Sequence, residues 1–101
     1  MSQHAYEVIV RKDLEDLIPG FLANRQKEVG LLASALIAED FAQLRQLGHR
    51  MKGIGGSYGF ALITALGERV ERFVRSCDLT GVAGCVAEYR DFLSKVCIKF
   101  K

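Results

Sequence analysis

The 101-residue sequence has no tryptophan, one proline, two histidines and three cysteines. Because these residue types are rare, several classes of protein are not expected. The number of cysteines is odd, and no two of them have a C-x-x-C spacing; they are Cys77, Cys85 and Cys97. Neither a disulfide framework nor a zinc site is therefore supported. We expect all three to be small buried apolar residues in a reducing cytosol. The longest apolar stretch, residues 29–38, is well short of the roughly 20 residues that cross a bilayer, so no membrane segment is predicted.

An excess of charge of one sign is also missing. The 14 Lys and Arg residues nearly balance the 12 Asp and Glu residues, which leaves a net charge of +2 and makes nucleic acid an unexpected partner. The opening "MSQHAYEVIVRKDLED" is charged throughout and has no apolar run typical of a signal peptide, so we expect a cytoplasmic protein. Without linkers or repeats, residues 1–101 are predicted to form a single domain.

Caps and apolar spacing divide the chain into helices. Asp13 can cap a short turn, Pro19 suits the first position of a longer helix, Asp40 can cap the next, and Asp78 or Thr80 the last. The expected helices cover residues 13–18, 19–37, 41–57, 61–77 and 80–96. This pattern predicts an all-α fold, an antiparallel up-down-up-down four-helix bundle with a short extra N-terminal helix. The terminal segments "YEVIV" and "VCIKF" could also pair as two strands.

Four glycines stand inside the expected helix 41–57, in "LGHRMKGIGGSYGF", although each costs roughly 1 kcal/mol relative to alanine there. At about 100° per residue, Gly53 and Gly56 fall on the same face as His49, opposite the apolar stripe. A face without side chains lets the backbone of another molecule approach. Gly48 and Gly55 lie toward the flanks, where close packing against a neighbouring helix is the better explanation.

Cationic side chains flank this histidine. Arg45 lies one turn before His49, Lys52 nearly one turn after it and Arg50 at its side, which prepares the face for an anion. A neutral imidazole can attack phosphorus. A lone exposed histidine is most often an ordinary surface residue, and His4 is interpreted in that way, but the bare face favours a function for His49.

These residues resemble the signature of the histidine-containing phosphotransfer (HPt) domain. In that signature x-x-K-G follows a histidine and, after four more residues, there is an aromatic or aliphatic residue and then a glycine. The sequence reads H-R-M-K-G-I-G-G-S-Y-G, and the matching positions are His49, Lys52, Gly53, Tyr58 and Gly59, with Gly56 at the usual small position. Gly48 replaces a common alanine, and Arg50 stands where smaller or polar residues are frequent. These two departures remove no chemical group but bear on partner choice.

The resemblance implies that His49 accepts a phosphoryl group from a receiver-domain phospho-aspartate and passes it to another receiver aspartate, while Lys52 holds the phosphoryl oxygens. The partners would be receiver domains and a hybrid sensor histidine kinase, with Mg²⁺ on the receiver and no cofactor on this chain. The phosphorylated atom would be the imidazole nitrogen farther from the backbone. The expected docking surface comprises Arg45, Arg50, Gly53, Gly56 and Ser57, with Glu68 also exposed at its rim.

No glycine-rich nucleotide loop, Walker motif or acidic metal cluster occurs in the sequence, so we expect neither ATP binding nor kinase activity. Without an obvious second apolar face, the protein is expected to be a monomer. One alternative is a bundle that binds and sequesters a receiver or kinase while His49 stays unphosphorylated. Another is a purely structural helical domain, which would leave Gly53 and Gly56 unexplained.

Overall fold

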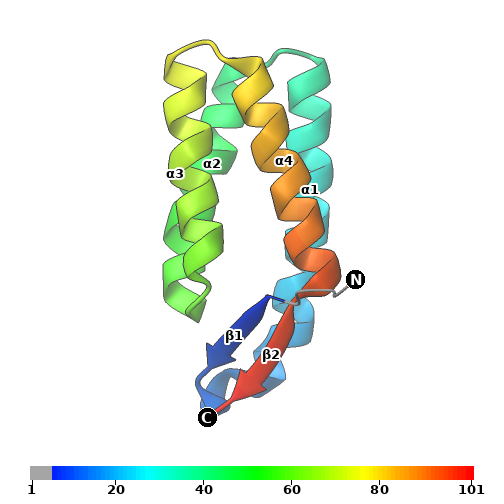
Figure 1. The fold of residues 1–101 in the computed structure, drawn as a ribbon, viewed down its shortest axis with the longest axis vertical. Coiled ribbons are helices and arrows are strands. Elements are labelled where there is room, and N and C mark those ends of the chain that lie inside the picture. Colours follow the sequence, from blue (N-terminus) through cyan, green and yellow to red (C-terminus); the bar gives the residue numbers. More distant parts are fainter. Residues whose placement is uncertain (1–5) are drawn as a thin grey trace, which may run out of the picture.

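The computed structural model describes residues 6–101, and His4 lies outside them. The fold is mostly helical, with four long helices side by side and two short strands at one end (Figure 1). In chain order the elements are β1 (Glu7–Val10), the 3₁₀ helix η1 (Lys12–Leu17), α1 (Ile18–Ile37), α2 (Phe41–Tyr58), α3 (Ala61–Arg75), α4 (Leu79–Lys95) and β2 (Cys97–Phe100).

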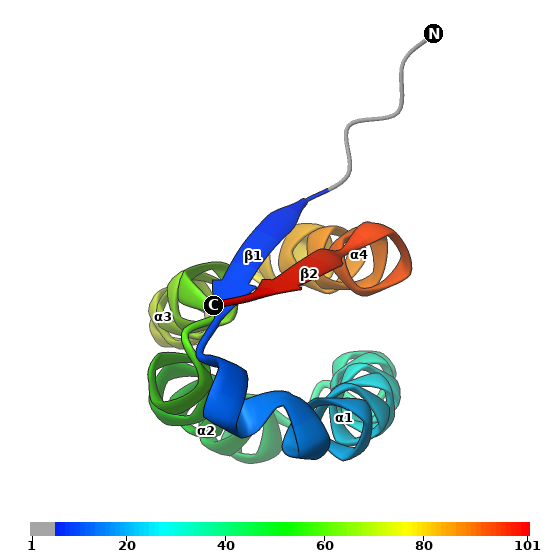
Figure 2. The same ribbon diagram turned by 90° about the horizontal axis from the view of Figure 1, so that it is seen from below.

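The four helices form a ring when they are viewed along the bundle (Figure 2). Consecutive helices are neighbours, α4 closes the ring against α1, and the most extensive contact is between α2 and α3. The chain turns back at three short connections, residues 38–40, 59–60 and 76–78. This arrangement buries one apolar stripe of each helix in a common core.

Aspartates begin two of the helices, as their positions in the sequence predict. The Asp40 carboxylate accepts a hydrogen bond from the Gln43 amide at 3.1 Å, and the Asp78 carboxylate accepts one from the Gly81 amide at 2.9 Å. Each cap satisfies an amide that has no partner within its own helix. At the other end of α2, Gly59 adopts a left-handed φ of 83°, which a glycine tolerates without strain.

The end of α3 differs from the prediction, because the helix stops at Arg75 rather than at residue 77. Cys77 has a positive φ of 54°, and the Asp78 amide donates to the Phe73 carbonyl at 2.8 Å, so the chain leaves the helix there. Cys77 is consequently exposed, as is Cys97 in β2, and only Cys85 is buried. The expectation that all three cysteines are buried was therefore wrong for two of them.

The N-terminal part also differs in detail. The short helix expected over residues 13–18 is the 3₁₀ helix η1, Lys12–Leu17, and α1 follows directly at Ile18 with Pro19 in its first turn. The bounds of α2 and α4 differ from the predicted ones by a residue at one or both ends.

Two strands make a purely all-α description incomplete. β1 and β2 pair in parallel, from Glu7 opposite Cys97 to Val10 opposite Phe100, and cross the end of the bundle (Figure 2). Parallel neighbours need a long crossover connection, and here the whole helical bundle is that connection. The pairing holds the first and last segments of the described chain side by side beneath the helices (Figure 1).

A buried polar cluster joins α1 to α4. The Tyr89 hydroxyl donates to Oε1 of Glu28 at 2.7 Å, and Nη1 of Arg25 lies 3.5 Å from the same oxygen. All three side chains are almost completely buried. Burial, together with the Glu28 charge, raises the pKa of Tyr89 far above its usual value, so the hydroxyl stays protonated and can donate this hydrogen bond.

Replacing Tyr89 with phenylalanine should lower the free energy of unfolding by about 1–3 kcal/mol, because the buried Glu28 carboxylate loses its hydroxyl donor. Urea denaturation measures the change. Tyr6→Phe is the matched control, since the Tyr6 hydroxyl donates to a half-exposed Asp91 carboxylate at 2.9 Å. Equal losses in the two variants would contradict the importance of the buried cluster.

Candidate functional site

Glycines allow α2 and α3 to approach unusually closely. A Cβ atom on Gly67 would lie 2.5 Å from the Gly48 carbonyl oxygen and 2.7 Å from the Lys52 amide nitrogen. A Cβ on Gly55 would lie 2.7 Å from the Thr64 amide nitrogen. The interpretation of Gly48 and Gly55 as packing positions is confirmed. Sequence reasoning missed Gly67, although a glycine in the middle of an amphipathic helix was the available signal.

The solvent-facing side of α2 is bare around His49, whose side chain is 74% exposed. A Cβ on Gly53 would meet nothing within 4 Å, and one on Gly56 would meet only the Thr64 hydroxyl at 3.9 Å. The buried stripe of α2 comprises Leu44, Leu47, Gly48, Met51 and Gly55. The helix thus presents an imidazole on a surface where little side-chain bulk blocks another molecule.

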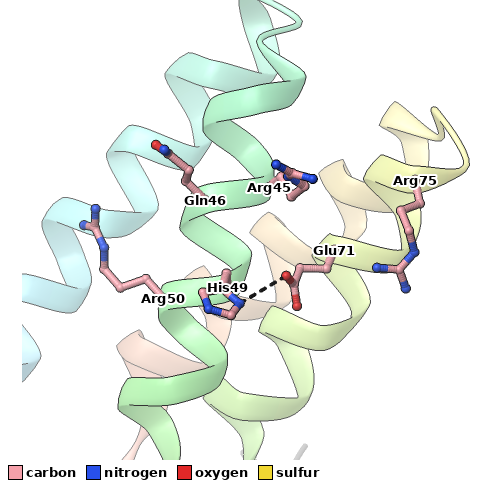
Figure 3. Close-up of a pocket in the computed structure, with 6 residues that line it drawn as sticks. All are labelled: Arg45, Gln46, His49, Arg50, Glu71 and Arg75. Carbon is pink, nitrogen blue, oxygen red and sulfur yellow. Dashed lines mark ion pairs between the residues drawn. The ribbon is translucent and has the colours of Figure 1, made fainter.

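Glu71 on α3 faces both polar groups of this surface. Its Oε2 lies 3.4 Å from Nδ1 of His49, and its Oε1 lies 3.0 Å from Nζ of Lys52 (Figure 3 draws the contact with His49). Only 13% of the Glu71 side chain is exposed, against 39% for Lys52. The carboxylate is therefore held at the edge of the core, while the Lys52 ammonium and the His49 imidazole reach solvent.

Sequence reasoning missed Glu71 and named only Glu68, which is exposed in the structure. Glu71 follows Gly67 by one helical turn, so the two positions share a face. Because Gly67 packs against α2, that face also directs Glu71 toward His49. The glycine in α3 was the signal that could have identified this carboxylate.

The charge state of Glu71 follows from its partners. Burial tends to raise the pKa of Glu71, but the hydrogen bond and charge of Lys52, with a smaller effect of His49, outweigh burial and hold the pKa below its usual value. The carboxylate is ionised at neutral pH. The face that the sequence predicts to be purely cationic thus contains one fixed negative charge.

This pKa shift makes stability depend on Glu71 in acid. A carboxylate whose pKa is lower in the folded state than in the unfolded state stabilises the fold at pH values above its unfolded-state pKa. This stabilisation is lost as the pH falls through the folded-state pKa. We expect the thermal midpoint of the parent to drop more steeply below pH 4.5, the usual glutamate value, than that of Glu71→Gln. Calorimetry over a pH series measures both, and parallel curves would contradict the assignment.

A hollow of about 700 Å³ lies beside the histidine. Its lining residues are Arg45, Gln46, His49, Arg50, Glu71 and Arg75 (Figure 3). The predicted residues Arg45 and Arg50 are thus brought together with His49, whereas Gly53, Gly56 and Ser57 lie farther along α2 and do not line the hollow. Arg75 was not predicted, because it comes from α3.

The arrangement suits nucleophilic chemistry on an anionic group. The exposed imidazole supplies a nitrogen nucleophile, and cationic side chains around it can compensate negative charge. Within residues 6–101, no group of three or more His, Cys, Asp or Glu side chains is placed to hold a metal ion. None of the helices in this part of the chain is long and apolar enough to span a membrane.

Comparison with known proteins finds a family model that matches most of the chain. Residues 16–97 match the family model described as the Hpt domain, which covers all four helices. Searches of curated proteins and of solved structures gave no significant match.

Proposed function

We propose that this protein is a phosphorelay intermediate that carries the phosphoryl group on His49. The chain belongs to the Hpt domain family, whose members carry out histidine phosphotransfer in two-component signalling. It accepts a phosphoryl group from a receiver-domain phospho-aspartate and passes it to the aspartate of another receiver. The observation that carries the proposal is the exposed imidazole with its Nδ1 atom 3.4 Å from the largely buried Glu71 carboxylate, on a helix face bare at Gly53 and Gly56.

The contact with Glu71 supports Nε2 as the attacking atom. A carboxylate beside Nδ1 favours the tautomer with its proton on Nδ1, which leaves the Nε2 lone pair free. Nε2 then forms a bond to phosphorus while the phosphorus–oxygen bond of the acyl phosphate breaks and the aspartate leaves as a carboxylate. The ring becomes positively charged, and the ionised Glu71 stabilises that charge.

Lys52 is proposed to hold the phosphoryl oxygens. Its Nζ atom is 3.0 Å from Glu71, and 39% of its side chain is exposed, so the ammonium can turn toward a phosphoryl group while staying near the carboxylate. Phosphoryl transfer needs little beyond an in-line nucleophile and compensation of the charge on the transferred oxygens. One lysine on this chain and a Mg²⁺ ion on the receiver provide that compensation.

Replacing Lys52 with alanine should slow transfer by about 10- to 100-fold, because one charge-stabilising donor is lost. The thermal midpoint should fall modestly, because the largely buried Glu71 carboxylate loses its nearest cationic partner, but the domain should stay folded at the assay temperature because no core side chain is removed. Rapid-quench measurement of phosphoryl transfer from a phosphorylated receiver gives the rate. Transfer at the parental rate would refute the role of Lys52.

Receiver domains and a hybrid sensor histidine kinase are the proposed partners. The kinase would supply phosphoryl groups from ATP, so that this chain needs no nucleotide site of its own and acts as a phosphotransfer protein without kinase activity. We propose that it works as a monomer in the cytoplasm, where receiver domains are found.

The decisive experiment is intact-mass measurement after incubation with a phosphorylated receiver domain and Mg²⁺. We expect the gain of one phosphoryl group, and its loss on acid treatment, because the phosphorus–nitrogen bond of phosphohistidine is acid-labile. If a panel of receivers binds the protein but never transfers a phosphoryl group, the sequestering bundle replaces the phosphorelay intermediate as the best account.

A further inference from the structure

Three arginines that line the hollow beside His49 have no acidic partner in the part of the chain that the structure describes. Arg45, Arg50 and Arg75 line it, and none of them forms an ion pair within residues 6–101. The one carboxylate that shares the hollow, Glu71, already contacts both Lys52 and His49. The guanidinium groups therefore leave this region with uncompensated positive charge.

Arg45 and Arg75 belong to different helices but border the same space. Arg45 projects from α2 toward α3, one turn before His49, and Arg75 projects from the last turn of α3, one turn after Glu71 (Figure 3). Arg50 instead extends toward α1 on the other side of His49 (Figure 3). Two guanidinium groups thus flank an opening on the Glu71 side of the histidine.

We infer that Arg45 and Arg75 form a second anion-binding site, which takes a surface carboxylate of the docking partner while His49 takes the phosphoryl group. Planar guanidinium groups bind carboxylates through two parallel hydrogen bonds. The positive charges of the two guanidinium groups repel each other in the free protein, and in the complex one partner carboxylate would compensate both of them. The inference deepens the proposed function, because it gives the receiver partner an acidic docking surface beside its phospho-aspartate.

A protein carboxylate fits this site better than a nucleic acid. The uncompensated cations form a short group around one hollow, and the net charge of the chain is only +2. Strong nucleic-acid binding requires a longer basic surface that contacts several phosphates. The negative Glu71 in the same hollow would also repel a continuous phosphate backbone, whereas a single carboxylate can settle between the two arginines.

The test uses hexaglutamate as a probe and follows the side-chain Nε–Hε signals of arginine by NMR. Arg75→Glu should weaken peptide binding by about tenfold or more, since it removes one guanidinium and adds a repelling charge. Arg90→Glu on α4 is the matched control, because Arg90 is exposed, lies outside the hollow and changes the net charge equally. We expect the control to bind the peptide almost as the parent does.

Several results would overturn the inference. These are equal weakening by the two variants, unchanged Arg45 and Arg75 signals at millimolar peptide, or tighter binding of hexathymidylate than of hexaglutamate at the same salt concentration. Mass measurement after treating the parent with phosphoramidate, a small phosphoryl donor, tests His49 separately. Failure of that reaction would count against the proposed function, while the peptide titration would still decide whether the anion site exists.

Discussion

Replacing His49 with glutamine is expected to abolish phosphoryl acceptance completely, because an amide nitrogen cannot act as the nucleophile that the imidazole provides. The fold should be almost unaffected. With 74% of its side chain exposed, His49 contributes little to the core, and surface substitutions of this kind usually change stability by about 0.5 kcal/mol or less. Glu71 keeps Lys52 as a partner at 3.0 Å, so no buried charge is left uncompensated.

The measurement compares the mass gain of parent and His49→Gln after incubation with the same phosphorylated receiver, and circular dichroism compares their thermal midpoints. Residual acid-labile phosphorylation of the variant would place the acceptor elsewhere. A lowered midpoint with a lost mass gain would mean that His49 supports the fold, and then the loss of transfer could not be assigned to chemistry.

Replacing Gly67 with alanine should strongly destabilise the protein, although it adds only one methyl group. The added carbon would lie 2.5 Å from the Gly48 carbonyl oxygen and 2.7 Å from the Lys52 amide nitrogen. Both obstacles are backbone atoms of α2, so no rotamer change can relieve the clash. Separating the helices should cost about 3 kcal/mol or more, at the upper end of overpacking effects, and it would also shift Glu71 away from His49.

Gly53→Ala is the matched control, because the same methyl group is added to the bare face of α2, where nothing lies within 4 Å. Alanine is the better helix former, so this variant should gain roughly 1 kcal/mol. Urea denaturation of both variants measures the difference. Equal effects in the two would mean that the contact between α2 and α3 is looser than the distances indicate.

The local chemistry of the chain accounts for most of the helix boundaries. Asp40 and Asp78 begin helices because their carboxylates reach amides three residues ahead, and Gly59 ends one because it adopts a positive φ easily. The end of α3 could not be found in this way. Cys77 takes a left-handed conformation that its residue type does not favour, and the hydrogen bond from the Asp78 amide back to Phe73 accompanies the turn.

The parallel pairing of β1 and β2 also depends on the whole fold. Alternation of apolar and polar residues near both ends of the chain is compatible with strands. Whether the strands run parallel or antiparallel depends on where the helical bundle places each terminal segment. The sequence could therefore suggest the pairing and not its orientation. The same holds for Cys97, whose exposure follows from its place on the outer side of that small sheet.

At the candidate site, the sequence by itself determined the features that lie on a single helix, α2. The exposed imidazole, the neighbouring Lys52 and the bare positions at Gly53 and Gly56 follow from the periodicity of α2, since residues on one turn of a helix have known relative directions. Glu71 and Arg75 are on α3, more than 20 residues away along the chain from His49. Only the tertiary structure brought them to the histidine, because the distance between two helix faces depends on how closely their backbones pack, and here glycines at that contact allow an unusually close approach.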